Sequence, residues 1–256
     1  MALLEVAGLT RSFGGLMAVS AVDLQIERGE IMGMIGPNGA GKTTVFNLLT
    51  GIYRPDKGSI VFDGRGLIGL KPHAIAAAGM ARTFQTIRLF PNMTVLENVM
   101  SGRHCRSKAG VWGAVLRPRG QRTEEQDIRK EAERRLKFMN IWHFRNELAK
   151  NLSYGDQRRV EVARALATDP KLLILDEPAA GLNEQESNDL TALIRGIRDM
   201  GVTVFLIEHD MKVVMGVSDR VIVLDNGQKI AEGTPIEVQA NPRVIEAYLG
   251  REEEEM

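Results

Sequence analysis

The stretch Gly36-Pro37-Asn38-Gly39-Ala40-Gly41-Lys42-Thr43-Thr44 decides the fold of this chain. It fits the phosphate-binding loop pattern, in which a glycine is followed by four residues and then by Gly-Lys-Ser/Thr. Residues 30–35 before it are mostly apolar and bounded by glycines, which is typical of a buried strand. After it, apolar residues recur at helical spacing as far as Gly51, a helix stop signal. The stretch is therefore predicted to join a strand to the N-terminus of a helix.

Such a loop can hold the phosphates of a nucleotide for physical reasons. Gly36, Gly39 and Gly41 carry no Cβ that would keep phosphate oxygens away from the backbone. Successive N–H groups then point inward, and the helix start adds unpaired donors and a partial positive charge. Lys42 supplies a mobile cation, and the Thr43 hydroxyl can coordinate Mg²⁺. The alternative interpretation is a glycine-rich turn with a chance lysine.

Length and composition narrow the class of protein. The 256 residues suit one large domain, or a core with a smaller lobe, and the formal net charge of zero gives no global field towards nucleic acid. The single cysteine, Cys105, excludes an internal disulfide framework. No signal peptide is recognisable, and no segment approaches the roughly 18 apolar residues of a membrane span. We therefore expect a cytoplasmic protein that acts at a membrane only through partners.

Polar side chains follow two further predicted strands. Residues 172–175 are aliphatic and are followed by Asp176 and Glu177, and residues 202–207 are followed closely by His209. Alternating strands and helices indicate a mostly parallel α/β sheet, in which ligands gather at the carboxyl ends of strands. There Asp176 could hold Mg²⁺ through a water and Glu177 could polarise a water for attack on a γ-phosphate. A structural carboxylate pair and a satisfied core histidine are the alternatives.

Four other residues are candidate ligand contacts. Phe13 could stack on an adenine ring or pack in the core. Gln85, just past a predicted strand, could reach Mg²⁺ or an attacking water, or could be a surface amide. Ser153 and Gly155 stand at the start of a predicted helix, which is either an anion-receptive N-terminus or a plain serine cap.

Residues 90–165 are predicted to form a helical lobe inserted between strands of the core. Thr94 and Glu97 have capping-box spacing at the start of one helix, and residues 123–140 form a second, highly charged one. Between them, residues 103–122 contain a cluster of arginines and lysine among glycines and prolines. This cluster is either a basic contact surface or a solvated loop.

The phosphate loop, Gln85, residues 152–157 (Leu-Ser-Tyr-Gly-Asp-Gln), residues 172–177 and His209 stand in an order that resembles the ATP-binding cassette (ABC) ATPases. The resemblance covers nearly the whole chain. It implies an α/β P-loop NTPase fold: a RecA-like core with an antiparallel β subdomain and an inserted helical lobe. On this basis residues 1–256 form one nucleotide-binding domain. Its core covers about 1–89 and 166–235, its lobe 90–165 and its C-terminal extension 236–256.

The resemblance also implies ligands and roles for particular residues. ATP would lie between the phosphate loop of one subunit and the signature helix of a second, in a head-to-tail dimer. Nucleotide contacts would come from Phe13, Gly36, Pro37, Asn38, Gly39, Ala40, Gly41, Lys42, Thr43, Thr44, Ser153 and Gly155. Mg²⁺ would be held by Thr43, Gln85 and Asp176. Glu177 would be the catalytic glutamate, His209 the switch histidine and Gln85 the Q-loop residue.

Three positions depart from the commonest family pattern. Tyr154 and Asp156 replace a glycine and a glutamine of the usual Leu-Ser-Gly-Gly-Gln signature, and Asn183 replaces an aspartate. Ser153 and Gly155, which would meet phosphate, remain. The resemblance therefore leaves the effect of these three positions on coupling across the dimer open.

More narrowly, residues 82–85, 89–90 with 93–98, the signature at 153–155, 208–211 and 241–250 resemble the LivG-type subunits of bacterial branched-chain amino acid importers, and the basic insertion near 103–122 fits the same subunits. Urea and amide importers and lipopolysaccharide-export ATPases share much of this pattern. A soluble ABC protein of DNA repair or translation fits less well, because there is one cassette and no heptad run. The implied partners are a second ATPase subunit (a copy or a LivF-like chain), permeases and, indirectly, a periplasmic binding protein. Leu89, Phe90 and Met93 could form the permease groove or could simply pack the lobe.

Overall fold

The computed structural model describes residues 2–103 and 119–252. The chain divides into two compact units. The first comprises Met1–Ile75 and Lys171–Met256, and the second comprises Ala76–Pro170. Most of the basic segment 103–122 lies outside the described residues, so the alternatives for its role stay predictions.

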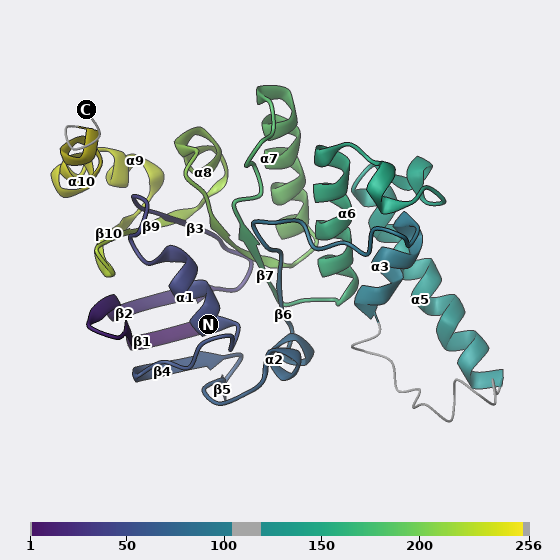
Figure 1. The fold of residues 1–256 in the computed structure, drawn as a ribbon, viewed down its shortest axis with the longest axis horizontal. Coiled ribbons are helices and arrows are strands. Elements are labelled where there is room, and N and C mark those ends of the chain that lie inside the picture. Colours follow the sequence, from purple (N-terminus) through teal and green to yellow (C-terminus); the bar gives the residue numbers. More distant parts are fainter. Residues whose placement is uncertain (1, 104–118, 253–256) are drawn as a thin grey trace. The chain divides into compact units, whose positions relative to one another are not determined.

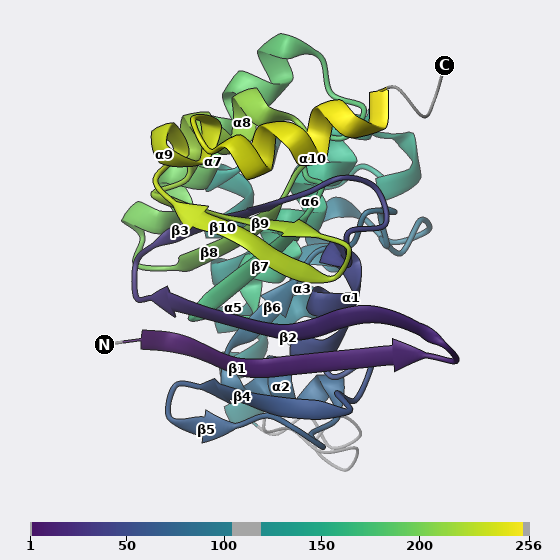
Figure 2. The ribbon, with the colours of Figure 1, turned by 90° about the vertical axis from the view of Figure 1, so that its left-hand side faces the viewer.

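The N-terminal part of the first unit is an antiparallel sheet in the order β2-β1-β4-β5 (Figure 2). Its strands are β1 (Ala2–Phe13), β2 (Leu16–Glu27), β4 (Lys57–Phe62) and β5 (Arg65–Gly66). In β2, Val22, Leu24 and Ile26 are buried while the residues between them are exposed. This period of two puts one face of the sheet on a core and leaves the other to water. The antiparallel β subdomain expected from the sequence is confirmed.

A second sheet in the same unit is mostly parallel. It contains β3 (Ile31–Ile35), β7 (Leu172–Asp176), β8 (Thr203–Ile207), β9 (Arg220–Asp225) and β10 (Gln228–Gly233). These strands lie in the order β10-β9-β3-β8-β7, with only β10 antiparallel to its neighbour. Every residue of β3, β7 and β8 is buried, as expected for strands covered on both faces. The carboxyl ends of β3, β7 and β8 therefore meet at one edge.

Helices complete the first unit. They are α1 (Lys42–Leu49), α7 (Glu184–Asp199), α8 (Met211–Val217), α9 (Pro235–Gln239) and α10 (Pro242–Glu252), while α2 (Pro72–Ala78) runs into the second unit. Figure 2 shows α9 and α10 beside α8 and the β9–β10 hairpin. Val238 and Val244 from these helices pack into one buried cluster with Ile35, Val214 and Val223. The C-terminal helices thus share a core with the strand that leads into the phosphate loop.

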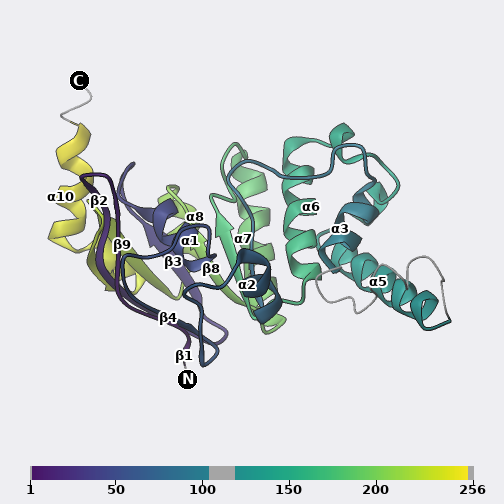
Figure 3. The ribbon, with the colours of Figure 1, turned by 60° about the horizontal axis from the view of Figure 1, so that its bottom comes forward.

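The second unit is mainly helical. It contains β6 (Met80–Arg82), α3 (Val95–Arg103), α5 (Arg119–Phe138), α6 (Tyr154–Ala167) and the short 3₁₀ helices η2 (Trp142–Phe144) and η3 (Ala149–Asn151). Figure 3 shows α3, α5 and α6 packed together. The predicted start of α3 is confirmed, because Glu97 N donates to Thr94 Oγ1 and Thr94 N donates to Glu97 Oε2. The lobe expected over residues 90–165 falls within this unit.

Candidate functional site

The predicted phosphate loop runs from the end of β3 to the start of α1 (Figure 1). Gly36, Gly39 and Gly41 have φ angles of 153°, 79° and 99°, which L side chains rarely adopt. A Cβ added at Gly36 would lie 2.2 Å from the carbonyl oxygen of Leu224, and one at Gly41 would lie 2.5 Å from that of Ala18. Both glycines are therefore required by backbone conformation and by close packing.

Lys42 and the start of α1 make this loop receptive to anions. The Lys42 Nζ donates to the carbonyl oxygens of Gly36 at 2.5 Å and Pro37 at 3.0 Å. Its side chain is thus folded over the loop. The N-cap of α1 is Gly41, which supplies no side-chain hydrogen bond to the first turn. The N–H groups of that turn can therefore receive phosphate oxygens, helped by the helix dipole.

Phe13 is not a core residue. It ends β1 and is 40% exposed, which excludes the packed-core interpretation of this position. Its ring meets the ring of Tyr53 edge-on, with 5.1 Å between centroids, and the Arg11 guanidinium lies 4.9 Å from the Phe13 centroid. Although Arg11 lies over this ring, the 40% exposure of Phe13 leaves part of the aromatic surface accessible for a base to stack on.

Asp176 and Glu177 differ sharply in their backbone setting at the end of β7. Asp176 is the last residue of the strand and is 3% exposed. Glu177 has a left-handed backbone, with φ of 47°, and its N–H donates to the carbonyl oxygen of Ile207 at the end of β8. A non-glycine residue in this conformation stores strain of roughly 1–3 kcal/mol. The left-handed backbone sets the direction in which the Glu177 side chain leaves the strand.

His209 and Glu208 follow β8 beside this carboxylate. His209 Nδ1 lies 3.8 Å from Glu177 Oε2, and the histidine side chain is 63% exposed, so the core alternative for His209 is wrong. Glu208 is fully buried, and its carboxylate accepts from Ala179 N at 2.6 Å and from His209 N at 3.2 Å. Burial raises the pKa of Glu208. Glu208 thus connects the backbone at Ala179, just after Glu177, to the backbone of His209. The sequence did not indicate this role.

The predicted Mg²⁺ ligands divide between the two units. Thr43 and Asp176 belong to the first unit and Gln85 to the second. A hydroxyl, a carboxylate and an amide oxygen are hard donors that suit Mg²⁺, which keeps several waters and needs few protein ligands. Within residues 2–103 and 119–252, no cluster of three or more His, Cys, Asp or Glu side chains could hold a metal alone. The donor chemistry therefore fits a Mg²⁺ that is also bound by substrate phosphates.

In the second unit, Ser153 is the N-cap of α6. Its Oγ accepts from Asp156 N at 3.2 Å and donates to Asp156 Oδ2 at 2.7 Å. Ser153 thus caps the helix and is exposed, with Gly155 in the first turn, and the anion-receptive role of this N-terminus stays a prediction. Asp156, which departs from the commonest signature, therefore orients the hydroxyl that the resemblance assigns to phosphate.

Gln85 lies in the segment between β6 and α3, and its side chain is exposed. Its backbone carbonyl accepts a hydrogen bond from Arg158, a buried arginine on α6. Nothing in the sequence distinguishes Arg158, because one more arginine in a charged helix is ordinarily solvated.

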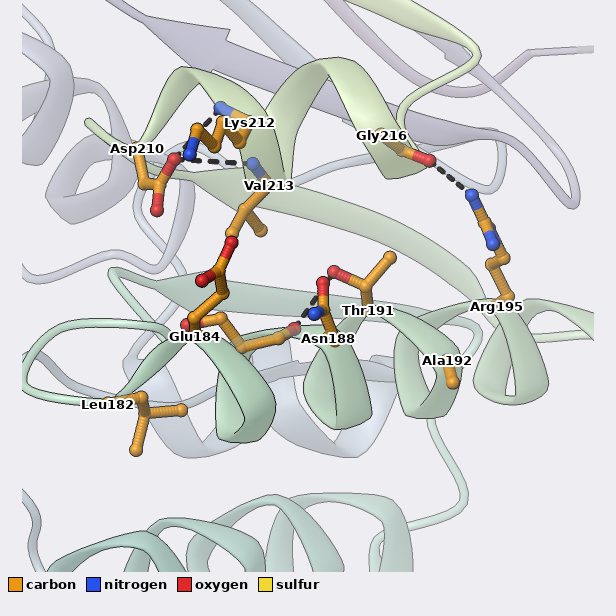
Figure 4. A pocket seen from close by; sticks show the side chains of 11 residues that line it. Leu182, Glu184, Asn188, Thr191, Ala192, Arg195, Asp210, Lys212, Val213 and Gly216 are labelled. Carbon is orange, nitrogen blue, oxygen red and sulfur yellow. Dashed lines mark hydrogen bonds between the residues drawn. The ribbon is translucent and has the colours of Figure 1, made fainter.

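A polar hollow of about 640 Å³ lies between α7 and α8 (Figure 4). Arg195 donates to the carbonyl of Gly216 at one end, and Asp210 caps α8 at the other. Its walls are Leu182, Glu184, Ser187, Asn188, Thr191, Ala192, Arg195, Asp210, Lys212, Val213 and Gly216. None of the predicted nucleotide contacts lines this hollow.

Comparison with known families gives two matches. The family described as ABC transporter matches residues 19–180. The family described as Branched-chain amino acid ATP-binding cassette transporter matches residues 228–254, the region of β10, α9 and α10.

Curated relatives align over almost the whole chain. The high-affinity branched-chain amino acid transport ATP-binding protein BraF of Pseudomonas aeruginosa is 48% identical over 97% of this chain and 98% of its own length. The LivG protein of Escherichia coli K12, of the same description, is 47% identical over the same shares. The lipopolysaccharide export ATP-binding protein LptB of Haemophilus influenzae is 36% identical over 98% of this chain and 99% of its own length.

Solved structures agree with these relatives. The ADP conformation of an ATP-binding cassette of an ABC transporter superimposes with a TM-score of 0.85 at 32% identity, covering 98% of this chain and 99% of that one. A dimeric bacterial ABC transporter cassette superimposes with a TM-score of 0.77 at 26% identity, covering 91% and 98%.

Proposed function

The chain belongs to the ABC transporter ATP-binding family, and from this premise we propose that it is the ATP-hydrolysing subunit of a branched-chain amino acid importer. The observation that carries the proposal is the full-length similarity to BraF and LivG together with the separate match at residues 228–254. A family match to the cassette alone would leave the transported substrate open.

ATP binds at the start of α1 in this proposal. The N–H groups of the glycine-rich loop and Lys42 receive the phosphates, and the exposed Phe13 ring stacks on the adenine. To reach the β- and γ-phosphates, the Lys42 ammonium exchanges its bonds to the loop carbonyls for bonds to phosphate oxygens. Nucleotide binding therefore changes the hydrogen bonds of Lys42.

Hydrolysis uses the side chains at the ends of β7 and β8. Glu177 orients and polarises the attacking water, and His209 contacts the γ-phosphate from the neighbouring strand end. Thr43, Asp176 and Gln85 are the residues that would hold Mg²⁺, which neutralises charge developing on the phosphate oxygens. The strained backbone of Glu177 keeps its carboxylate in place before the substrate arrives.

Two subunits complete each active site. Ser153 and Gly155 at the start of α6 meet the phosphates bound by a second subunit, either a copy of this chain or a LivF-like chain. Pairing of two subunits is supported by the similarity to a dimeric bacterial ABC transporter cassette. ATP added to the Glu177→Gln variant should then trap a dimer on a sizing column. A variant that binds ATP tightly and stays monomeric at every concentration contradicts the pairing.

Permease subunits would receive the work of ATP binding at the cytoplasmic face of the membrane. No helix in the described parts of the chain is long and apolar enough to cross a membrane. Phe90 is 51% exposed, and Leu89 and Met93 are half-buried beside it, so an amphipathic permease helix could dock on these three residues. Charge substitution at Phe90 should uncouple uptake from ATP binding. Normal uptake and co-purification would place the docking site elsewhere.

The substrate class is tested by reconstitution. The chain is combined with permeases, a second ATPase and a binding protein of a branched-chain amino acid importer, and ATP-driven uptake of leucine, isoleucine and valine is compared with uptake of urea. Uptake of the branched-chain amino acids alone supports the proposal. Urea uptake, or lipopolysaccharide release by a complex with export permeases, would instead assign the chain to an amide importer or to the function of LptB, its 36% identical relative.

A further inference from the structure

A buried arginine on α6 donates hydrogen bonds to the backbone of the segment that carries Gln85. Arg158 is 1% exposed, and its Nη1 donates to the carbonyl oxygen of Phe84 at 2.7 Å while its Nη2 donates to that of Gln85 at 2.8 Å. The segment between β6 and α3 and the helix α6 are thereby joined across more than seventy residues of sequence. Two donors of one planar guanidinium on adjacent carbonyls fix both position and orientation, which a lysine could not do.

Glu161, one turn further along α6, holds the same segment at a second point. It is 1% exposed, its Oε2 lies 3.1 Å from Arg158 Nη1, and its Oε1 accepts from Arg88 N at 3.3 Å. Burial raises the pKa of Glu161, and the Arg158 charge opposes that shift. The buried ion pair therefore contacts the backbone at 84–85 through its cation and at Arg88 through its anion.

Stability is a weak explanation for this pair. Burying two charges costs desolvation that their attraction often only offsets, and well-packed apolar residues usually serve as well. Arg158 Nε is moreover buried without a hydrogen-bond partner. A pair that gains little stability and leaves one donor unsatisfied is better explained by the geometry that it imposes on residues 84–88.

Tyr154 connects this pair to the start of α6. Arg158 Nη2 donates to the Tyr154 hydroxyl at 3.0 Å, and the guanidinium carbon lies 5.6 Å from the tyrosine ring centre. Tyr154 directly follows Ser153, the N-cap of the helix, and stands where the commonest family signature has glycine. A glycine there would carry no hydroxyl, so this contact belongs to the variant signature.

We propose that Arg158 is a positioning residue that locks the Gln85 backbone to the Ser153 end of α6, with Tyr154 completing the lock. The inference rests on the proposed ATPase function and deepens it. Gln85 approaches the Mg²⁺ and γ-phosphate of its own subunit, whereas Ser153 approaches the phosphates of the partner subunit. Because the Gln85 segment and the start of α6 are joined, a shift of either one on nucleotide binding should move the other with it.

The first test measures, without ATP, how firmly Arg158 and Glu161 hold the backbone of residues 84–90. Arg158→Met alone leaves the buried Glu161 carboxylate without its Arg158 partner, with the Arg164 guanidinium 4.0 Å away, so the chain that is compared carries Arg158→Met together with Glu161→Met, an apolar pair of similar volume. Hydrogen exchange is followed at the Arg88 amide and in peptides covering residues 84–90. We expect exchange at least tenfold faster than in the wild type. Lys130→Met, which removes a 74% exposed cation from α5, is the matched control and should leave exchange unchanged.

The second test reads catalysis in the reconstituted transporter. Tyr154→Phe removes only the hydroxyl and should lower kcat severalfold with little change in the KM for ATP, because the phosphate loop is intact. Arg158→Lys keeps the positive charge but loses the planar guanidinium that donates to two carbonyls at once. It should lower kcat and the amount transported per ATP at least tenfold. Full activity in Arg158→Lys would show that only charge is needed and would overturn the lock.

Failure of the inference can be told from failure of the proposed function. If wild-type chain hydrolyses ATP and the double variant exchanges at the wild-type rate, the lock is wrong and the ATPase stands. If wild-type chain hydrolyses no ATP but exchange accelerates as expected, the lock exists and the proposed function is wrong.

Discussion

His209 Nδ1 lies 3.8 Å from Glu177 Oε2, across the ends of two neighbouring parallel strands. The pairing of β7 with β8 places both residues at one edge, and the Glu177 N–H donates to Ile207 O to hold them in register. The histidine side chain is 63% exposed and that of Glu177 is 21% exposed. Solvent and substrate therefore reach the imidazole freely, while the carboxylate is partly sheltered.

The first prediction separates binding from hydrolysis at Glu177. Glu177→Gln should keep ATP affinity and lower turnover by roughly 10²- to 10⁴-fold, because an amide cannot act as a base. Lys42→Ala is the contrasting variant and should weaken ATP binding itself, since it removes the cation of the loop. Equilibrium binding and steady-state ATPase rates on the assembled transporter measure both effects. Equal turnover in wild type and Glu177→Gln would exclude Glu177 as the base.

The second prediction concerns the left-handed backbone of Glu177. Of two variants that both remove its carboxylate, Glu177→Gly should be more stable than Glu177→Ala by about 1 kcal/mol, since a left-handed L residue costs roughly 1–2 kcal/mol. This order is the reverse of that in a helix interior. Urea unfolding of the two variants measures the difference. If Glu177→Ala is the more stable, the strain is absent in solution.

The parts of this fold that the sequence predicts are those encoded locally. The runs that form β3, β7 and β8 are almost entirely apolar and bounded by loops, so their burial follows from the pattern alone. The glycines of the phosphate loop can be interpreted from the sequence because few residues other than glycine fit such tight turns. The cap of α3 by Thr94 and Glu97 is likewise a matter of three-residue spacing.

The features that escape the sequence depend on contacts between distant residues. Arg158 and Phe84 are 74 residues apart, and Glu208 and Ala179 are 29 apart. A buried arginine in a charged helix has no local signature, because the pattern alone does not say which charges a neighbouring segment will cover. The left-handed backbone of Glu177 also cannot be predicted from the sequence, since glutamate has no preference for that region.

The third prediction concerns pH and Glu208. Burial raises its folded-state pKa above the usual 4.5, so the folded protein holds this proton more tightly than the unfolded chain does. The resulting stability is fully present below pH 4.5 and is lost as the pH rises through the folded pKa. Glu208→Gln removes this titration, so its unfolding free energy should fall less than that of the wild type as the pH is raised from 4.5.

Glu237 supplies a control of opposite sign for that experiment. Its pKa is lowered, chiefly by the hydrogen bond from Thr234 N, so its contribution is present above its unfolded pKa and is lost as the pH falls through its folded pKa. Glu237→Gln should flatten the acid limb of the stability curve only. Parallel curves for Glu208→Gln and the wild type above pH 4.5 would mean that Glu208 is not desolvated.

The last prediction concerns Tyr248, on α10. The residue packs against the cluster that contains Ile35 and Val223, and its hydroxyl oxygen is buried without a completed hydrogen bond. Burial raises the pKa of this phenol, while the Gly36 amide acts in the opposite direction. The C-terminal helix thus places an unsatisfied hydroxyl beside the first glycine of the phosphate loop.

Tyr248→Phe should raise the unfolding free energy by about 1 kcal/mol, because an apolar ring of the same shape removes a buried hydroxyl whose hydrogen bond with the Gly36 amide is incomplete. Tyr53→Phe, at a 37% exposed ring, is the matched control and should change stability by less than about 0.5 kcal/mol. Urea unfolding measures both, and ATP affinity is measured alongside. A loss of stability in Tyr248→Phe would show instead that the hydroxyl is hydrogen-bonded in solution. If Tyr248→Phe also weakens ATP binding, the bond is to the Gly36 amide, because a hydrogen bond there would hold the phosphate loop in place.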